Sequence, residues 1–339
     1  MSTRVITFRE AINEAIRLEM RRDPTVILMG EDVAGGAATH LEEKGTEAWG
    51  GDLGVTKGLV TEFGRERVRD TPISESAFIG AAVGAASTGL RPIAELMFVD
   101  FFGVCMDQIF NQGGKLRYMF GGKAKVPMVI RTLIGAGFRA AAQHSAVLYS
   151  VFAHMPGLKC VVPSTPYNAK GLLAAAVRDD DPVIYFEHLV LLDTTGPVPE
   201  GEYVVPLGKA EIARPGKDAT VVAIGRMRLF ALQAADELAK DGIDVEVVDP
   251  QSISPLDEST ILESVKNTRR VVVVDDDNPR CSVAHDIVTL AAQQAFDYLD
   301  APPQTVTAPH APVPFSPVLE DAYLPSPAKI AAAVRGVVA

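Results

Sequence analysis

Short apolar runs alternate with longer segments of helical periodicity along most of this chain. The runs typical of buried strands in its first part are residues 26–29, 93–96, 126–132, 160–162 and 183–186. Between them, helical periodicity is found at about 75–89, 101–119, 142–152 and 168–178. Continuous apolar strands that alternate with helices are typical of a mostly parallel sheet with helices on both faces. The pattern therefore predicts an α/β fold built on such a sheet.

The same alternation resumes after a segment of different composition. Residues 193–206 hold three prolines and two glycines, which is typical of a linker or an irregular excursion between domains. Beyond it we expect strands at 219–224, 245–248, 271–274 and 305–307, and helices at 228–240 and 282–297. The pattern predicts two domains, at residues 1–190 and 207–339, joined by a linker at 191–206.

Three helix starts can be predicted from capping residues. Thr7-Phe8-Arg9-Glu10 is a capping-box pattern, and the residues after it place their apolar side chains on one helical face. We expect one helix of the second domain to be capped at Ser254-Pro255-Leu256-Asp257, and Ser282 is a suitable cap for another.

The composition is that of an ordinary globular protein. Of the 339 residues, 47% are hydrophobic and 22% are charged, and the formal net charge is −11 at pH 7. This charge argues against nucleic acid or an anionic membrane as a partner, and no apolar stretch approaches the roughly 20 residues of a membrane span. Residues 1–20 lack the pattern of a secretory signal, and Cys105, Cys160 and Cys281 lack disulfide or zinc spacing. We therefore expect reduced core thiols in a cytoplasmic protein.

One stretch places a carboxylate where a short strand meets an unusual helix. In residues 70–75, Pro72 favours extended geometry before it, which puts Glu75 at or near the first turn of the helix. Gly80 and Gly84 then lie on one helical face with almost no side chain, so another backbone can approach closely. An acid that acts on a buried cofactor would lie in such a place. The alternative stays open, because acidic residues favour helix N-termini through the helix dipole alone.

Glu31 is a second candidate acid, because it directly follows the apolar run at 26–29. Ligands of open parallel sheets bind beyond the carboxyl ends of the strands, so Glu31 and Glu75 could face the same crevice. The chain has no GxGxxG after a strand and no P-loop motif, which argues against a self-contained dinucleotide or triphosphate site. Gly121-Gly122 and Gly135-Ala136-Gly137 are more typical of turns than of phosphate loops.

A series of motifs in a fixed order extends from residue 30 to residue 326. The motifs lie at 30–33, 70–75, 89–95, 107–109, 141–145, 156–159, 169–173, 178–182 and 323–326. Through them the chain resembles, over essentially its whole length, the β subunits of thiamine-diphosphate-dependent 2-oxo acid dehydrogenase complexes. This family includes the pyruvate, branched-chain and acetoin dehydrogenases. Glu75, Gly80, Ala81 and Gly84 also resemble the pattern shared by the pyrimidine-binding domains of thiamine enzymes.

The resemblance implies an architecture and a partner. It implies a transketolase-like pyrimidine-binding domain at about 1–190 and a transketolase C-terminal domain from about 207. In this family the diphosphate and its magnesium are held by a Gly-Asp-Gly…Asn motif of the α subunit, and this chain lacks that motif. We therefore expect thiamine diphosphate to lie between two polypeptides of an α2β2 heterotetramer, and the β chain to be inactive alone. The resemblance also implies a lipoyl-bearing dihydrolipoamide acyltransferase core as a partner.

The resemblance further implies which residues surround the pyrimidine. Glu75 matches the catalytic glutamate, whose carboxyl group hydrogen-bonds a ring nitrogen and favours the imino tautomer that takes the thiazolium proton. Glu31 matches a second glutamate, assigned to a proton relay between two active sites; a solvated strand-end carboxylate is the alternative. Ile73, Met97 and Phe101 match positions around the pyrimidine, with Phe101 stacked on it, although Phe101 could equally be a core residue.

Two further sets of positions follow from the same resemblance. His144 matches the histidine that faces the incoming lipoyl group and supplies a proton during acyl transfer, a task suited to an imidazole; a structural histidine is the alternative. The positions at which relatives bind a potassium ion, mainly through backbone carbonyls, are Met128, Ala176, Val177, Asp179 and Asp181. For residues 179–181 the alternative is a solvated turn after a helix.

Three segments favour the acetoin branch of the family, namely Trp49-Gly50-Gly51, residues 99–104 and residues 275–282. We therefore expect the β subunit of a component that cleaves acetoin to acetaldehyde and a hydroxyethyl-cofactor intermediate, with transfer of the acetyl group to a lipoyl acyltransferase. The first alternative is a pyruvate or branched-chain 2-oxo acid dehydrogenase component, which releases carbon dioxide instead. The second is a non-catalytic scaffold subunit that docks the α subunit and the acyltransferase core.

Overall fold

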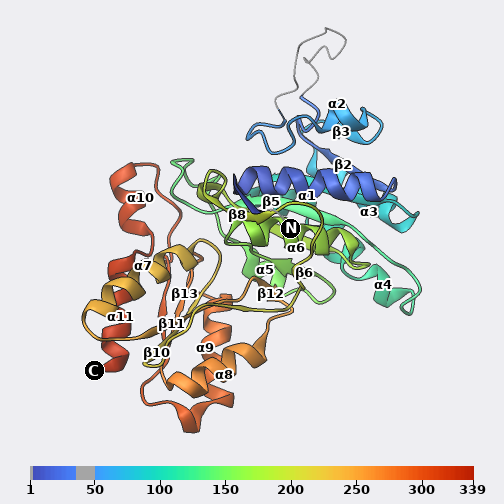
Figure 1. Ribbon diagram of the computed structural model, residues 1–339. Coiled ribbons are helices and arrows are strands. Elements are labelled where there is room, and N and C mark those ends of the chain that lie inside the picture. Colours follow the sequence, from blue (N-terminus) through green and yellow to red (C-terminus); the bar gives the residue numbers. More distant parts are fainter. Residues whose placement is uncertain (1–2, 36–49) are drawn as a thin grey trace. The chain divides into compact units, whose positions relative to one another are not determined.

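The computed structural model describes residues 3–35 and 50–339, so Trp49 lies outside the described residues. The chain divides into two compact units (Figure 1). Unit 1 comprises Met1–Leu133, His154–Glu187 and Leu191–Leu207, and unit 2 comprises Ile134–Ala153, His188–Val190 and Gly208–Ala339. The domain boundaries expected from the sequence stay a prediction.

A parallel sheet with buried strands forms the centre of unit 1. The six strands that unit 1 contributes to this sheet follow the order β6-β7-β5-β4-β2-β3, and β2 pairs in parallel with both β3 and β4. Every residue of β2, β5 and β7 is buried, as expected for a parallel sheet covered on both faces. These strands are β2 (Val26–Gly30), β3 (Val68–Asp70), β4 (Arg91–Phe98), β5 (Val129–Ile134), β6 (Lys159–Val161) and β7 (Val183–His188).

The helices of unit 1 begin largely where the sequence predicts. The capping box at Thr7 is confirmed: the Thr7 hydroxyl accepts from the Glu10 backbone N–H at 3.1 Å, and the Glu10 carboxylate accepts from the Thr7 backbone N–H at 2.8 Å. Helix α1 packs against α6, and α3 packs against β4. The helices are α1 (Phe8–Arg22), α2 (Leu59–Phe63), α3 (Glu75–Ser87), α4 (Leu116–Met119) and α6 (Pro166–Arg178).

Two predicted helices are wrong in part. Residues 101–119 form a 3₁₀-helix (Val99–Cys105), a π-helix (Gln108–Gly113) and the short α4 instead of one α-helix. The π-helix ends at Gly114, whose backbone N–H donates to the Ile109 carbonyl at 2.9 Å. Of residues 142–152, only those in α5 (Tyr149–Ala153) are helical, because the preceding residues Arg139 and Ala141 take left-handed φ angles of 65° and 62°.

The proline-rich segment also differs from a plain linker. It contains β8 (Thr195–Pro199), which pairs antiparallel with β1 (Thr3–Thr7) in a two-stranded ribbon. Prolines are tolerated in such edge strands because no further strand needs their missing N–H groups. The strand β1 itself carries no clear periodicity and is not predicted from the sequence.

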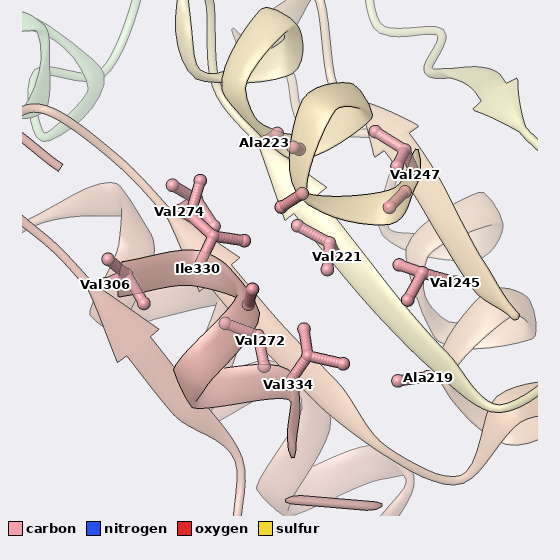
Figure 2. Packing of buried hydrophobic residues seen from close by; sticks show 14 of the residues in the cluster. Ala219, Val221, Ala223, Val245, Val247, Val272, Val274, Val306, Ile330 and Val334 are labelled. Carbon is pink, nitrogen blue, oxygen red and sulfur yellow. The ribbon is translucent and has the colours of Figure 1, made fainter. Parts of the chain in front are cut away.

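Unit 2 is built on a five-stranded sheet of order β14-β13-β10-β11-β9, in which β9 alone pairs antiparallel. Its core joins valines of β10, β11 and β13 to apolar side chains of α7 and α11; Figure 2 shows Val221 and Val247 with Ile330 and Val334. Strands and helices are β9 (Glu211–Arg214), β10 (Ala219–Ala223), β11 (Val245–Asp249), β12 (Ser252–Ser254), β13 (Val271–Val274), β14 (Gln304–Val306), α7 (Met227–Lys240), α8 (Glu258–Thr268), α9 (Val283–Gln294), α10 (Pro317–Tyr323) and α11 (Pro327–Val338).

The predicted caps of unit 2 are confirmed, whereas one cysteine assignment is wrong. The Asp257 side chain caps α8, and the Ser282 side chain caps α9. Cys105 and Cys160 are buried as expected, but Cys281 is exposed, because it lies in the turn before α9 with a φ of 52°. Among the described residues, no helix is both long and apolar enough to cross a membrane.

Candidate active site

The residues of unit 1 that are predicted to surround the pyrimidine lie at or shortly after the carboxyl ends of three adjacent strands. Glu31 directly follows β2, which lies between β3 and β4 in the sheet. Gly30, the last residue of β2, pairs with Asp70 on one side and with Glu95 on the other. The predicted location of Glu31 at such a strand end is therefore confirmed.

Glu75 begins α3 and is half-buried. The segment before it is fixed to β2, because the Thr71 backbone N–H donates to the Gly30 carbonyl at 2.9 Å. Burial and, to a smaller extent, the charge of Glu75 together raise the pKa of the Cys105 thiol to about 12. The charge of Glu75 also raises the pKa of Glu31. Glu75 therefore lies within electrostatic range of both side chains.

Glu31 lies among several other carboxylates. Burial is the main cause that raises its pKa, and the charges of Asp52, Asp32, Glu75 and Glu95 raise it further. A carboxyl group in such surroundings retains its proton at a higher pH than a solvated one. The site is thus suited to a ligand that accepts a proton or a hydrogen bond from a carboxylic acid.

Apolar side chains adjoin these acids. Met97, near the end of β4, is buried and lines a narrow pocket that also includes Gly51 and Glu95. Phe101 is half-buried and meets Phe98 edge to face, with ring centroids 6.4 Å apart. The Ile73 side chain is 72% exposed, which is unusual for an isoleucine beside a cluster of buried residues.

A buried ion cluster beneath this site was missed by our sequence reasoning. Arg131 of β5 donates from Nη1 to Glu95 of β4 at 2.6 Å, and from Nε and Nη2 to the two oxygens of Glu187 of β7 at 2.6 and 2.8 Å. Burial raises the pKa of Glu187, and the charge of Arg131 opposes that rise. The signal that could have revealed it is a charged residue in the middle of three apolar strands, a rare event unless the charges pair.

His144 belongs to unit 2, in the loop that joins β5 to α5, whereas Glu31, Ile73, Glu75, Met97 and Phe101 all belong to unit 1. The imidazole is half-buried, and the His144 backbone N–H donates to the Ala141 carbonyl at 3.5 Å.

The expected potassium positions lie in unit 1, around the end of α6. The carbonyl oxygens of Val177 and Asp179 both accept from Arg91 Nη1, at 3.1 and 2.8 Å. The Ala176 and Met128 carbonyls each accept one backbone N–H, at 3.2 and 3.0 Å. A carbonyl oxygen has two lone pairs, so each of these four can still coordinate a cation.

The carboxylates of the same region are paired with cations of this chain. Lys159 Nζ donates to both oxygens of Asp179, at 2.8 and 2.7 Å, and lies 3.3 Å from Asp181. Arg117 donates to Asp181 at 2.5 Å. Any ion held here would therefore rely on neutral carbonyl oxygens. Elsewhere in the described ranges, no group of three or more His, Cys, Asp or Glu side chains is arranged to hold a metal.

The comparisons with known proteins first define the class of fold. Residues 4–193 match the transketolase pyrimidine-binding domain, and residues 208–330 match the transketolase C-terminal domain. A solved structure described as a split gene transketolase, inactive β4 tetramer, superposes with a TM-score of 0.77 at 21% identity and covers 98% of both chains. The protein therefore has the two-domain α/β fold of transketolases, as the motifs predicted.

The relatives then define the family. The chain is 61% identical over 328 residues to the acetoin:2,6-dichlorophenolindophenol oxidoreductase subunit beta of Bacillus subtilis, covering 96% of this chain and 95% of the relative. Identity to the protein of the same name from Cupriavidus necator is 59%, covering 98% and 97%. The pyruvate dehydrogenase E1 component subunit beta of Rhizobium meliloti is 45% identical, covering 98% and 70%. The chain belongs to the family of acetoin and 2-oxo acid dehydrogenase β subunits, which confirms the resemblance seen in the sequence.

Proposed function

We propose that this chain is the β subunit of a thiamine-diphosphate-dependent enzyme that cleaves acetoin and passes the acetyl group to a lipoyl group. The observation that carries this proposal is the identity of about 60% to two acetoin oxidoreductase β subunits over nearly the whole chain. Pyruvate is the second candidate substrate, because a pyruvate dehydrogenase β subunit is 45% identical over a similar length.

The carboxylates at the strand ends are suited to the pyrimidine ring of thiamine diphosphate and not to its diphosphate group. An aminopyrimidine ring has a basic nitrogen that can accept a hydrogen bond from a carboxyl group, and Glu75 and Glu31 supply such groups. A diphosphate anion would be repelled by the same carboxylates. We therefore assign the diphosphate and its magnesium to an α subunit in an α2β2 assembly. When bound, the cofactor supplies a nucleophilic carbon that adds to the substrate carbonyl and accepts the electron pair of the broken C–C bond.

The residues of unit 1 have separate tasks in this proposal. Glu75 donates a hydrogen bond to the pyrimidine nitrogen and stabilises the tautomer in which the exocyclic nitrogen can take a proton. Glu31, whose pKa is raised by burial and by the neighbouring carboxylates, would take part in a proton relay between the two active sites of the assembly. Met97, Phe101 and Ile73 would supply the apolar contacts to the pyrimidine ring.

His144 of unit 2 acts in the transfer step. In that step a C–S bond would form between the two-carbon unit and one lipoyl sulfur as the S–S bond breaks, which oxidises the unit to the acyl level and reduces the disulfide. Formation of the acetyl carbonyl would then break the bond that holds the unit to the cofactor. The departing sulfur takes the proton of His144, and the hydroxyl proton released when the carbonyl forms can return to the imidazole. The acceptor is a lipoyl-bearing acyltransferase.

The substrate assignment can be tested on the chain assembled with its α subunit and thiamine diphosphate. We expect kcat/KM for acetoin to exceed that for pyruvate by about 10-fold or more when reduction of 2,6-dichlorophenolindophenol is followed. The β chain alone should show no turnover with either. A preference for pyruvate would overturn the assignment to acetoin and leave the family unchanged.

Potassium at the end of α6 is a separate prediction. If the carbonyls of Met128, Ala176, Val177 and Asp179 hold K⁺, then KCl should stabilise the protein more than NaCl at equal ionic strength. A K⁺ concentration 100 times the dissociation constant would add about 2.7 kcal/mol to the free energy of unfolding. Urea denaturation in the two salts measures this difference. Coincident denaturation curves would mean that no K⁺ binds here and that the side chains of Arg91 and Lys159 take the place of the cation.

A further inference from the structure

The loop that carries His144 has an unusual backbone. It joins β5 to α5, and four residues within seven take left-handed φ angles: Gly135 at 96°, Gly137 at 106°, Arg139 at 65° and Ala141 at 62°. Glycine adopts such angles easily, but arginine and alanine do so only where the surrounding structure holds them. Contacts within unit 2 hold the loop in this conformation.

An ion cluster holds Arg139 against α10. Its Nη1 donates to Glu320 Oε2 at 2.6 Å and to the Pro317 carbonyl at 3.2 Å, and its Nη2 donates to Asp321 Oδ1 at 2.6 Å. One planar guanidinium thus bridges two successive carboxylates, a geometry that the single ammonium of a lysine cannot reproduce.

Glu320 fixes a second point of the same loop. Its side chain is fully buried, and its other oxygen, Oε1, accepts from the Gly137 backbone N–H at 2.6 Å. Directly before these points, the Ala136 side chain packs in a buried cluster with Tyr323 and Leu324. Arg226 Nη1 also donates to the Ala136 carbonyl at 2.9 Å. Residues 136–139 are therefore attached to the α10 region by both apolar and charged contacts.

A backbone hydrogen bond fixes the end of the loop, at Ala146, to its beginning, at Gly135. The Gly135 backbone N–H donates to the Ala146 carbonyl at 3.1 Å, which closes the loop. His144 consequently lies on the short span between the Arg139 cluster and this closing hydrogen bond. A change at Arg139 would alter the start of that span, while its end at Ala146 would stay in place.

We propose that the Arg139–Glu320–Asp321 cluster is a positioning device that sets His144 for acyl transfer to the lipoyl acceptor. Arg139 touches neither substrate nor cofactor in this proposal and acts only through the loop. The inference rests on the proposed role of His144 and adds to it the residues that make that role possible.

The test compares Arg139→Gly with Arg335→Ala in the assembled enzyme. Glycine suits the φ angle of residue 139, so the variant removes the guanidinium without backbone strain. Arg335 is a matched control, because it likewise bridges two carboxylates, Glu237 and Asp241, but lies on α11. Two rates are measured for each variant: acetylation of the intact lipoyl-bearing acyltransferase, and acetoin-dependent dye reduction, which needs no lipoyl group.

We expect Arg139→Gly to lower kcat/KM for the acyltransferase by about 10–100-fold, the scale of a misplaced catalytic group. Dye reduction should stay within about twofold, and Arg335→Ala should change neither rate. Asp321→Asn, which removes only the exposed partner, should give a smaller loss of the same kind. The double variant Arg139→Gly/His144→Ala should acetylate no more slowly than His144→Ala, because residues that act through one another are not additive.

Other outcomes would overturn the inference in distinguishable ways. If His144→Ala slows acetylation and Arg139→Gly does not, the role of His144 stands and the positioning device is refuted. If Arg139→Gly slows both rates equally, or adds its full effect to that of His144→Ala, the cluster does not act through His144. If His144→Ala acetylates at the normal rate, the proposed role of His144 fails and the inference fails with it.

Discussion

Replacement of Glu75 by Gln is expected to lower acetoin-dependent dye reduction by the assembled enzyme by about 10²–10⁴-fold. The glutamine side chain has nearly the same size and can reach the same position at the start of α3. It cannot act as an acid, so the cofactor pyrimidine would lose the group that stabilises its reactive tautomer. Steady-state rates at saturating acetoin and thiamine diphosphate measure the loss.

The matched control is Glu263→Gln, because Glu263 is an exposed glutamate on α8 of unit 2. It should leave the rate unchanged within about twofold. Co-purification with the α subunit shows whether either variant still assembles. Undiminished turnover by Glu75→Gln with both acetoin and pyruvate would remove Glu75 from catalysis and favour a scaffold role for the chain.

The positions of the buried strands along the chain could be predicted, because the signal for a buried strand is local in the sequence. A buried parallel strand is a continuous apolar run, and β2, β7, β10 and β13 all coincide closely with such runs. The conformation of residues 142–148 could not be predicted, because their periodicity favours a helix, whereas tertiary contacts of the loop, among them those of Arg139 and Ala136, hold another conformation. Tertiary contacts override the local helix propensity where residues distant in the sequence supply the hydrogen bonds.

The candidate site likewise has one part that a local sequence signal predicts and another that depends on contacts between residues distant in the sequence. The position of Glu31 follows from strand order, since the carboxyl ends of parallel strands meet at one edge of a sheet. The pairing of Arg131 with Glu95 and Glu187 could not be predicted in this way. Arg131 is 36 positions from Glu95 and 56 positions from Glu187 in the sequence, and the three residues lie on three different strands. Only the observed order of β4, β5 and β7 brings them together. The partners of charged residues inside apolar strands are thus the feature that could be predicted least from this sequence.

The largest loss of stability is expected from Arg131→Met. The methionine would leave Glu95 and Glu187 buried without their shared cation, and removing one member of a buried ion pair typically costs about 3–5 kcal/mol. Urea denaturation gives this difference in the free energy of unfolding. The exposed Arg335 is the control, because Arg335→Met breaks ion pairs in solvent and should lower the free energy of unfolding much less than Arg131→Met does.

The pH dependence of this loss identifies its cause. Burial raises the pKa of Glu187, so the folded state binds that proton more tightly than the unfolded state does. Stability from the protonated form is therefore present at low pH and is lost as the pH rises through the folded pKa. Without Arg131 this dependence should steepen, so the deficit of Arg131→Met should be smaller at pH 5 than at pH 8. The double variant Arg131→Met/Glu187→Gln should recover part of the stability at pH 8, whereas a deficit equal at both pH values would point to lost packing instead of unpaired charge.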